Sequence, residues 1–301
     1  MTAGTVNEMS TRLCLLTVHA HPDDEASKGP ATVARYHDEG IHTVLVCCTG
    51  GEEGDILNPA MDTPEIRADL AGVRLRELET SASLIGYNEL VMLGYRDSGM
   101  KDTPANARPD CFAQAPLDEA VGKLVAVIRR VRPQVIVTYE DDQQGYPHPD
   151  HLRDHEISVA AFEAAGDPAA FPDAGEAFQP LKLYYVGWSA ARVMAMHEKF
   201  IELGLESPFD EAWRERASKM TRIYTTAVDI SDYADVRREA LLAHATQVDP
   251  TSPFWFGLPP EVARTIHPVD EYILARSLVR TTGEGGFEDD LFAGVRDLAA
   301  R

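Results

Sequence analysis

The chain has 301 residues, of which 44% are hydrophobic, and this is enough apolar material for a substantial buried core. The formal net charge is -21, so an acidic surface would repel phosphate backbones and a nucleic acid is not expected as a partner. No apolar run approaches the length of a membrane span, and the first twelve residues lack the apolar stretch of a secretory signal. These features predict a soluble, cytoplasmic protein with no membrane partner.

Residues 1–11 are polar and predict a disordered leader, whereas residues 12–301 show no break in composition and predict a single domain. The four cysteines form no CxxC pair. Three of them, Cys14, Cys47 and Cys48, lie in apolar runs, which is typical of buried thiols in a reducing compartment.

The first half of the chain alternates apolar runs with amphipathic stretches. Buried strands are predicted over residues 13–18, 42–48, 90–93 and 135–139. Helices are predicted over residues 28–39, 65–85, about 117–128 and 148–165. Such alternation favours βαβ units, and therefore an α/β fold with a Rossmann-like, mostly parallel sheet and helices on both faces.

The second half of the chain is less regular. Strands are predicted over residues 183–186 and 224–230, and helices over residues 190–203 and 232–244. We therefore expect this half to add C-terminal elaborations to the same domain.

Two histidine and aspartate motifs each follow a predicted strand. His21-Pro22-Asp23-Asp24 comes after the first strand, and His148-Pro149-Asp150-His151 comes after the strand that ends at residue 139. Ligands of open α/β sheets bind beyond the carboxyl ends of the strands, so the two motifs are expected to face one crevice. Two imidazoles and one carboxylate with an open position are typical of catalytic zinc, and they also suit Fe²⁺.

Each motif also has a plainer interpretation. A single His-x-x-His on a helix is seldom a metal site, and His-Pro-Asp-Asp could be a turn before an acidic helix start. Asp23 could support a neighbouring ligand without taking part in the reaction. His155 and His19 are better explained as packed or supporting side chains than as ligands.

The segment VHAHPDDEASKG, at residues 18–29, resembles the first motif of the LmbE-like (PIG-L) zinc deacetylase superfamily, and GYPHPDH, at 145–151, resembles the second. Further segments narrow the resemblance to its mycothiol S-conjugate amidase branch: TGGE at 49–52, ILNPAMD at 56–62, DSG at 97–99, HATQVDP at 244–250 and DDLFAGVR at 289–296. The resemblance spans nearly the whole chain.

The resemblance implies a role for each matching position. The implied zinc ligands are His21, Asp24 and His151. Asp23 matches the general base that deprotonates water, and His148 matches the residue that stabilises the oxyanion or protonates the leaving amine. Tyr146 matches a mobile tyrosine that polarises the carbonyl, and Asp150 is expected to orient His148.

Five further positions are expected to contact or lie near the substrate: Lys28, Arg74, Asp97, His244 and Gln247. Among them, Lys28 is expected at the start of a helix, where it could reach acetylcysteinyl carbonyls or simply be solvated. The chain departs from the amidase pattern at residues 187–196, GWSAARVMAM, and its loop at Glu53 and Asp55 is more acidic than is usual.

The resemblance therefore implies zinc-dependent hydrolysis of the amide between cysteine and glucosamine in mycothiol S-conjugates, which is a detoxification reaction. The products would be an N-acetylcysteine S-conjugate and glucosaminyl inositol, and the partner is a small-molecule thiol-sugar conjugate. One alternative is a deacetylase of N-acetylglucosaminyl inositol, or a biosynthetic paralogue that acts on a mycothiol-derived antibiotic precursor. Another is a sugar-binding protein with a vestigial metal site. The sequence does not indicate an oligomeric state.

Overall fold

The computed structural model describes residues 12–141, 146–219, 222–280 and 287–299, so the predicted leader lies outside the described residues. The described strands form one sheet in the order β3-β2-β1-β4-β5-β7-β6. Their bounds are Cys14–His19 (β1), His42–Thr49 (β2), Glu89–Tyr95 (β3), Val135–Thr138 (β4), Lys182–Val186 (β5), Thr226–Asp229 (β6) and Val269–Ser277 (β7). Five neighbouring strands, β3 to β5, are parallel, and β7 runs antiparallel to β5 and β6.

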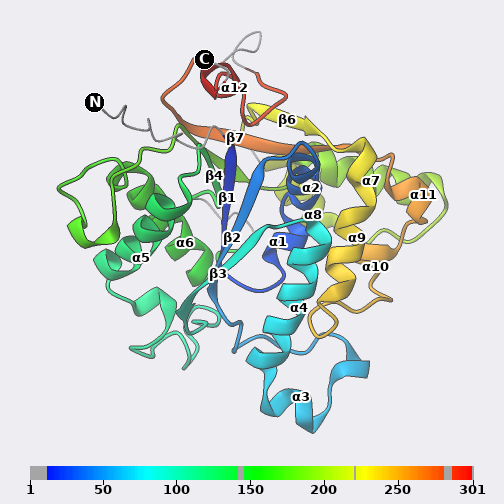
Figure 1. Cartoon of the computed structure of the whole chain (residues 1–301). Helices are drawn as coiled ribbons and strands as arrows, with labels where there is room; N and C mark the ends of the chain where they lie inside the picture. The colour runs from blue at the N-terminus through cyan, green and yellow to red at the C-terminus, as the bar shows by residue number, and fades with distance from the viewer. Residues whose placement is uncertain (1–11, 142–145, 220–221, 281–286, 300–301) are drawn as a thin grey trace, which may run out of the picture.

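Helices cover both faces of the sheet (Figure 1). In the first half they are α1 (Asp24–Ser27), α2 (Pro30–Asp38), α3 (Pro64–Ala68), α4 (Leu70–Ile85), α5 (Leu117–Val131) and α6 (Pro149–Ala164). In the second half they are α7 (Ala190–Glu202), α8 (Glu211–Lys219), α9 (Ala234–Ala243), α10 (Pro253–Phe256), α11 (Pro260–Ala263) and α12 (Arg296–Ala299). The predicted Rossmann-like architecture is confirmed.

The alternation of side chains along β1 separates two cores. Leu16 and Val18 face the core that contains α5 and α6, whereas Leu15 faces the core with α2 and α9. Strand order reverses between β1 and β4, because the chain leaves β1 toward β2 on one side and later enters β4 on the other. The carboxyl ends of these two strands form the crevice in which open α/β sheets bind their ligands.

Two predicted helices have different bounds in the structure. The helix expected over 65–85 is two helices, because the backbone leaves the helical conformation at Asp69, where φ is -137°. Thr63 accepts a hydrogen bond from the Ile66 amide and starts α3 as a separate capped turn. The helix expected from Lys28 begins at Pro30, because Gly29 adopts a left-handed conformation and separates α1 from α2.

The sequence patterns did not reveal β7, although it joins β5 to β6 at one edge of the sheet. Its side chains alternate incompletely between buried and half-buried, so it lacks the apolar run of a central strand. All four cysteines are buried and free, as expected for three of them. Among the described helices, none combines the length and the apolar character needed to cross a membrane.

Candidate metal and catalytic site

Both motifs meet in one cavity of about 320 Å³ at the carboxyl ends of β1 and β4. The first motif forms the loop between β1 and α1, and the second forms the first turn of α6. Their side chains share this cavity with the loop after β2, the loop after β3 and Gln247. The expected convergence of the two motifs on one crevice is therefore present.

Three donor atoms converge from the residues predicted as metal ligands. Asp24 Oδ2 lies 3.4 Å from His21 Nδ1 and 3.4 Å from His151 Nε2. All three residues are buried, and burial lowers the pKa of His151 to about 4, so this imidazole is neutral and able to ligate. Two imidazole nitrogens and one carboxylate oxygen form a donor set that fits zinc and also Fe²⁺.

Lys28 holds the other oxygen of the Asp24 carboxylate. Its Nζ lies 2.5 Å from Asp24 Oδ1, while the His21 amide donates to Oδ2 at 3.0 Å. Burial alone would raise the pKa of Asp24, but Lys28 and the neighbouring imidazoles hold it well below its usual value. Lys28 follows the last residue of α1 and does not start a helix, so its charge suits the local helix dipole.

A second group of acidic side chains faces the opposite nitrogen of His21. His21 Nε2 lies 3.2 Å from Asp150 Oδ2 and 3.5 Å from Asp97 Oδ1. Burial alone would lower the pKa of His21, but Asp150, Asp24 and Asp97 together raise it well above its usual value. The amide of Ser98 donates to Asp150 at 2.9 Å, so the carboxylate is fixed against His21.

Asp23 occupies a strained position beside the predicted metal ligands. Its φ is 120°, a conformation that non-glycine residues rarely adopt, and its carboxylate remains 30% exposed. Burial raises the pKa of Asp23, and Arg74, whose Nη2 lies 3.0 Å from Asp23 Oδ2, opposes this shift. An oriented carboxylate with a raised pKa, outside the converging donor set, has the properties of a general base.

His148 and Tyr146 also line the cavity. His148 caps α6, where its Nδ1 accepts a hydrogen bond from the Asp150 amide at 3.2 Å. Its ring lies 4.5 Å from the ring of His21, and burial lowers its pKa. Asp150 thus contacts His148 through its backbone, while its carboxylate contacts His21. Tyr146 is 58% exposed, with its ring 5.9 Å from that of His148.

Arg74 and His244, both expected near the substrate, support the loop of the first motif. Arg74 lines the cavity, but its guanidinium donates to the carbonyls of Gly51 at 2.8 Å and of Pro22 at 2.5 Å. His244 is fully buried, and its Nε2 lies 2.6 Å from Glu25 Oε1. The other Glu25 oxygen accepts from the Asp23 amide at 2.9 Å, so His244 supports the loop from behind.

Sequence reasoning missed Glu25 and Tyr139. Glu25 belongs to the first motif, and its complete burial with Ser81 and His244 as partners depends on tertiary contacts. Tyr139 stacks on His151 with ring centroids 4.4 Å apart, and its hydroxyl accepts a hydrogen bond from the Ala20 amide at 3.2 Å. The signal in the sequence was the position of Tyr139 directly after a buried strand, where residues of a binding crevice are expected.

Comparisons with known proteins agree with this geometry. The family model for GlcNAc-PI de-N-acetylase (PIG-L) matches residues 16–162. Mycothiol S-conjugate amidase of Streptomyces coelicolor is 45% identical to this chain, covering 97% of it and 100% of the relative. A 1D-myo-inositol 2-acetamido-2-deoxy-alpha-D-glucopyranoside deacetylase of Geodermatophilus obscurus is 41% identical, covering 93% of this chain and 97% of the relative.

Among solved structures, N,N'-diacetylchitobiose deacetylase from Pyrococcus horikoshii is similar, with a TM-score of 0.59 at 16% identity. The alignment covers 87% of this chain and 84% of that one. At this identity the likeness concerns the fold alone.

Proposed function

Because this chain belongs to the GlcNAc-PI de-N-acetylase (PIG-L) family, we propose that it is a metal-dependent hydrolase of C–N amide bonds. Its substrate would be a mycothiol S-conjugate, cleaved between cysteine and glucosamine. The observation that carries the proposal is the convergence of His21, Asp24 and His151, with Asp23 beside them and outside the donor set. A sugar-binding protein would have no need of this additional base.

Each side chain then has a chemical task. A zinc ion held by the three donors would supply Lewis acidity toward the amide carbonyl and toward water. Asp23 accepts the proton of the attacking water, and Arg74 keeps the Asp23 carboxylate oriented. His148 hydrogen-bonds the developing oxyanion or delivers a proton to the leaving amine, an effect worth about 3 to 4 kcal/mol in comparable sites. Tyr146, exposed at the rim, contacts the carbonyl from the other side.

The choice of substrate rests on the 45% identity to the amidase over nearly the entire chain. Deacetylation of N-acetylglucosaminyl inositol is the second candidate, since relatives with that activity in their names are 38 to 41% identical. Both reactions break an amide on the same glucosamine nitrogen, so the same side chains serve either. The two substrates differ in the acyl group, which is acetyl in one and N-acetylcysteinyl in the other.

Product analysis distinguishes the candidates. We expect the zinc-loaded protein to convert the bimane conjugate of mycothiol into N-acetylcysteinyl bimane and glucosaminyl inositol, and a chelator to stop the reaction. Faster release of acetate from N-acetylglucosaminyl inositol would identify a deacetylase instead. Failure to turn over either substrate, in protein that retains its metal, would support the binding-protein alternative.

A further inference from the structure

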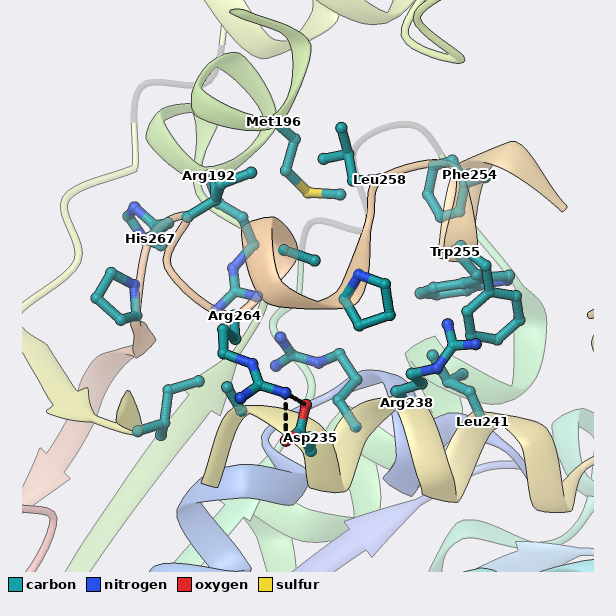
Figure 2. Close-up of a pocket in the computed structure, with 18 of the residues that line it drawn as sticks. Arg192, Met196, Asp235, Arg238, Leu241, Phe254, Trp255, Leu258, Arg264 and His267 are labelled. Carbon is teal, nitrogen blue, oxygen red and sulfur yellow. Dashed lines mark hydrogen bonds and ion pairs between the residues drawn. The ribbon is translucent and has the colours of Figure 1, made fainter. Parts of the chain in front are cut away.

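A second cavity, of about 120 Å³, lies between α7, α9, α10 and α11, and no described residue lines both it and the crevice (Figure 2). The segment 187–196, which departs from the amidase pattern, contributes three lining residues, Trp188, Arg192 and Met196. Figure 2 shows Met196 and Leu258 on one side of the hollow and Arg264 facing them. The departure in sequence therefore coincides with a cavity that the proposed reaction does not use.

Aromatic rings form one wall of this cavity. Trp188 stacks on Phe254 with ring centroids 5.7 Å apart and planes 3° from parallel, and Trp255 meets Phe254 edge to face at 4.7 Å. An apolar cavity of about 150 Å³ can hold benzene, so this cavity of about 120 Å³ can seat one edge of a single ring, with the rest of the ligand outside it. Such a wall favours a planar, apolar group.

The lining is also cationic, although the chain as a whole carries a net charge of -21. Four arginines line the cavity, and Asp235 is the one acidic residue among the described lining residues. Arg192 and Arg237 share a single carboxylate oxygen of Asp270, at 3.0 and 2.6 Å. These four arginines have only Asp270 and Asp235 as carboxylate partners in the described structure.

Arg238 is the arginine best placed to bind a further anion. Its guanidinium lies 4.7 Å from the ring centroid of Phe256, and no described carboxylate pairs with it. In Figure 2 it lies next to Trp255 at one end of the hollow. A planar guanidinium beside an aromatic surface suits a ligand that joins a carboxylate to an aromatic ring.

We propose that this cavity binds an N-acylcysteine whose sulfur carries an aromatic group, which is the class of acid released by the proposed amidase reaction. Hydrolysis converts a neutral amide into a carboxylate, so Arg238 distinguishes this acid from the intact conjugate. The aromatic group packs against the wall that Trp188, Phe254 and Trp255 form. The choice of ligand rests on the proposed function, whereas the cavity's preference for an aromatic anion does not.

Tryptophan fluorescence provides a direct assay, because two of the three tryptophans, Trp188 and Trp255, line the cavity. We expect N-acetyl-S-benzylcysteine to quench the metal-loaded protein saturably, and its uncharged carboxamide to bind at least 10-fold more weakly. Arg238→Gln should weaken binding of the acid at least 10-fold and leave kcat on the bimane conjugate unchanged. Met196→Trp, which fills the cavity, should abolish binding without removing a charge.

Two controls separate this cavity from the crevice. Arg276→Gln removes an exposed arginine of β7 that does not line the cavity, and it should bind the acid like the wild type. His151→Ala should lose turnover but keep acid binding. Binding lost in His151→Ala and kept in Arg238→Gln would overturn the proposal, as would equal binding of acid and carboxamide. Acid binding without turnover of mycothiol conjugates would refute only the proposed function.

Discussion

Two buried ionic clusters in this chain contain similar groups but differ in their balance of charge. Between β5 and the C-terminal segment, Lys182 Nζ lies 2.8 and 2.9 Å from the two oxygens of Glu288, and Tyr184 donates to the same carboxylate at 2.6 Å. One cation faces one anion there, and both side chains are fully buried. This cluster is electrically neutral and saturated with hydrogen bonds.

In the crevice cluster the charges do not cancel. Four carboxylates gather here, from Asp23, Asp24, Asp97 and Asp150, and they outnumber their cationic partners in the described structure, which are Lys28, Arg74 and His21 with its raised pKa. The surplus of negative charge is stable in a buried setting only if a cation joins it. The comparison shows that the balance of charge, and not burial alone, separates a binding site from a structural ion pair.

The largest effect on metal content and turnover should come from removing one of the three donors in the crevice cluster. His151→Ala should lose the metal and turnover together, beyond the roughly 10- to 100-fold losses typical of supporting residues. His155→Ala is the matched control, because His155 lies one turn further along α6 and contacts only the Tyr139 carbonyl and the Tyr185 ring in the described structure. Metal analysis and kinetics test both variants; near-stoichiometric zinc in His151→Ala would remove this residue from the ligand set.

The next largest effect distinguishes the proposed general base, Asp23, from the proposed metal ligand, Asp24. Asp23→Asn should keep the metal and lower kcat by about 10² to 10⁴-fold, the usual contribution of acid–base catalysis. Asparagine is the appropriate replacement because it tolerates a positive φ better than alanine does. Asp24→Asn should instead lose the metal. If the two variants showed the reverse pattern, the roles within the motif would be exchanged.

A smaller loss of turnover is expected when His244 is replaced, because His244 supports the loop of the first motif through Glu25. His244→Gln removes the partner of Glu25 and should lower turnover by roughly 10- to 100-fold, as loss of a supporting contact commonly does. The metal content should fall less than in His151→Ala. Turnover equal to that of the wild type would show that His244 does not position the loop.

The same pair predicts a pH dependence of stability. Burial alone would lower the pKa of His244, but Glu25 outweighs burial and raises it above its usual value. The stabilisation is therefore complete below about pH 6.5 and is lost as the pH rises through the raised pKa. Urea unfolding between pH 6 and 9 should show this decline in the wild type, and a flat profile in the wild type, matching that of His244→Gln, would contradict it.

Disrupting the Lys182–Glu288 cluster should lower the free energy of unfolding and leave turnover unchanged. Lys182→Met leaves Glu288 buried without its cation, which typically costs about 3 to 5 kcal/mol of unfolding free energy. The folded variant should retain the wild-type kcat, because none of these residues lines the crevice. Denaturant unfolding and kinetics on the same sample measure both quantities. A loss of kcat in the folded variant would mean that the two clusters are coupled.

The sequence predicted the parallel half of the sheet well, because its strands are continuous apolar runs and the two histidine motifs follow two of them directly. It could not predict which side chains the ligands would meet. Asp150 was expected to orient His148, and its carboxylate faces His21. Arg74 was expected at the substrate, and it donates hydrogen bonds to two backbone carbonyls and to Asp23. Such pairings join elements far apart in the chain, as His244 and Glu25 do, and no local pattern encodes them.

The backbone of Asp23 has a consequence for how this chain can evolve. A side chain held at φ 120° costs on the order of 1 to 3 kcal/mol, and glycine adopts that conformation without a comparable cost. Glycine at this position would therefore favour folding while removing the carboxylate. Laboratory evolution for heat resistance alone should drift toward glycine here, whereas selection for growth that needs the reaction should keep aspartate. An aspartate in this strained conformation is the outcome expected of selection for the reaction, and not of selection for stability alone.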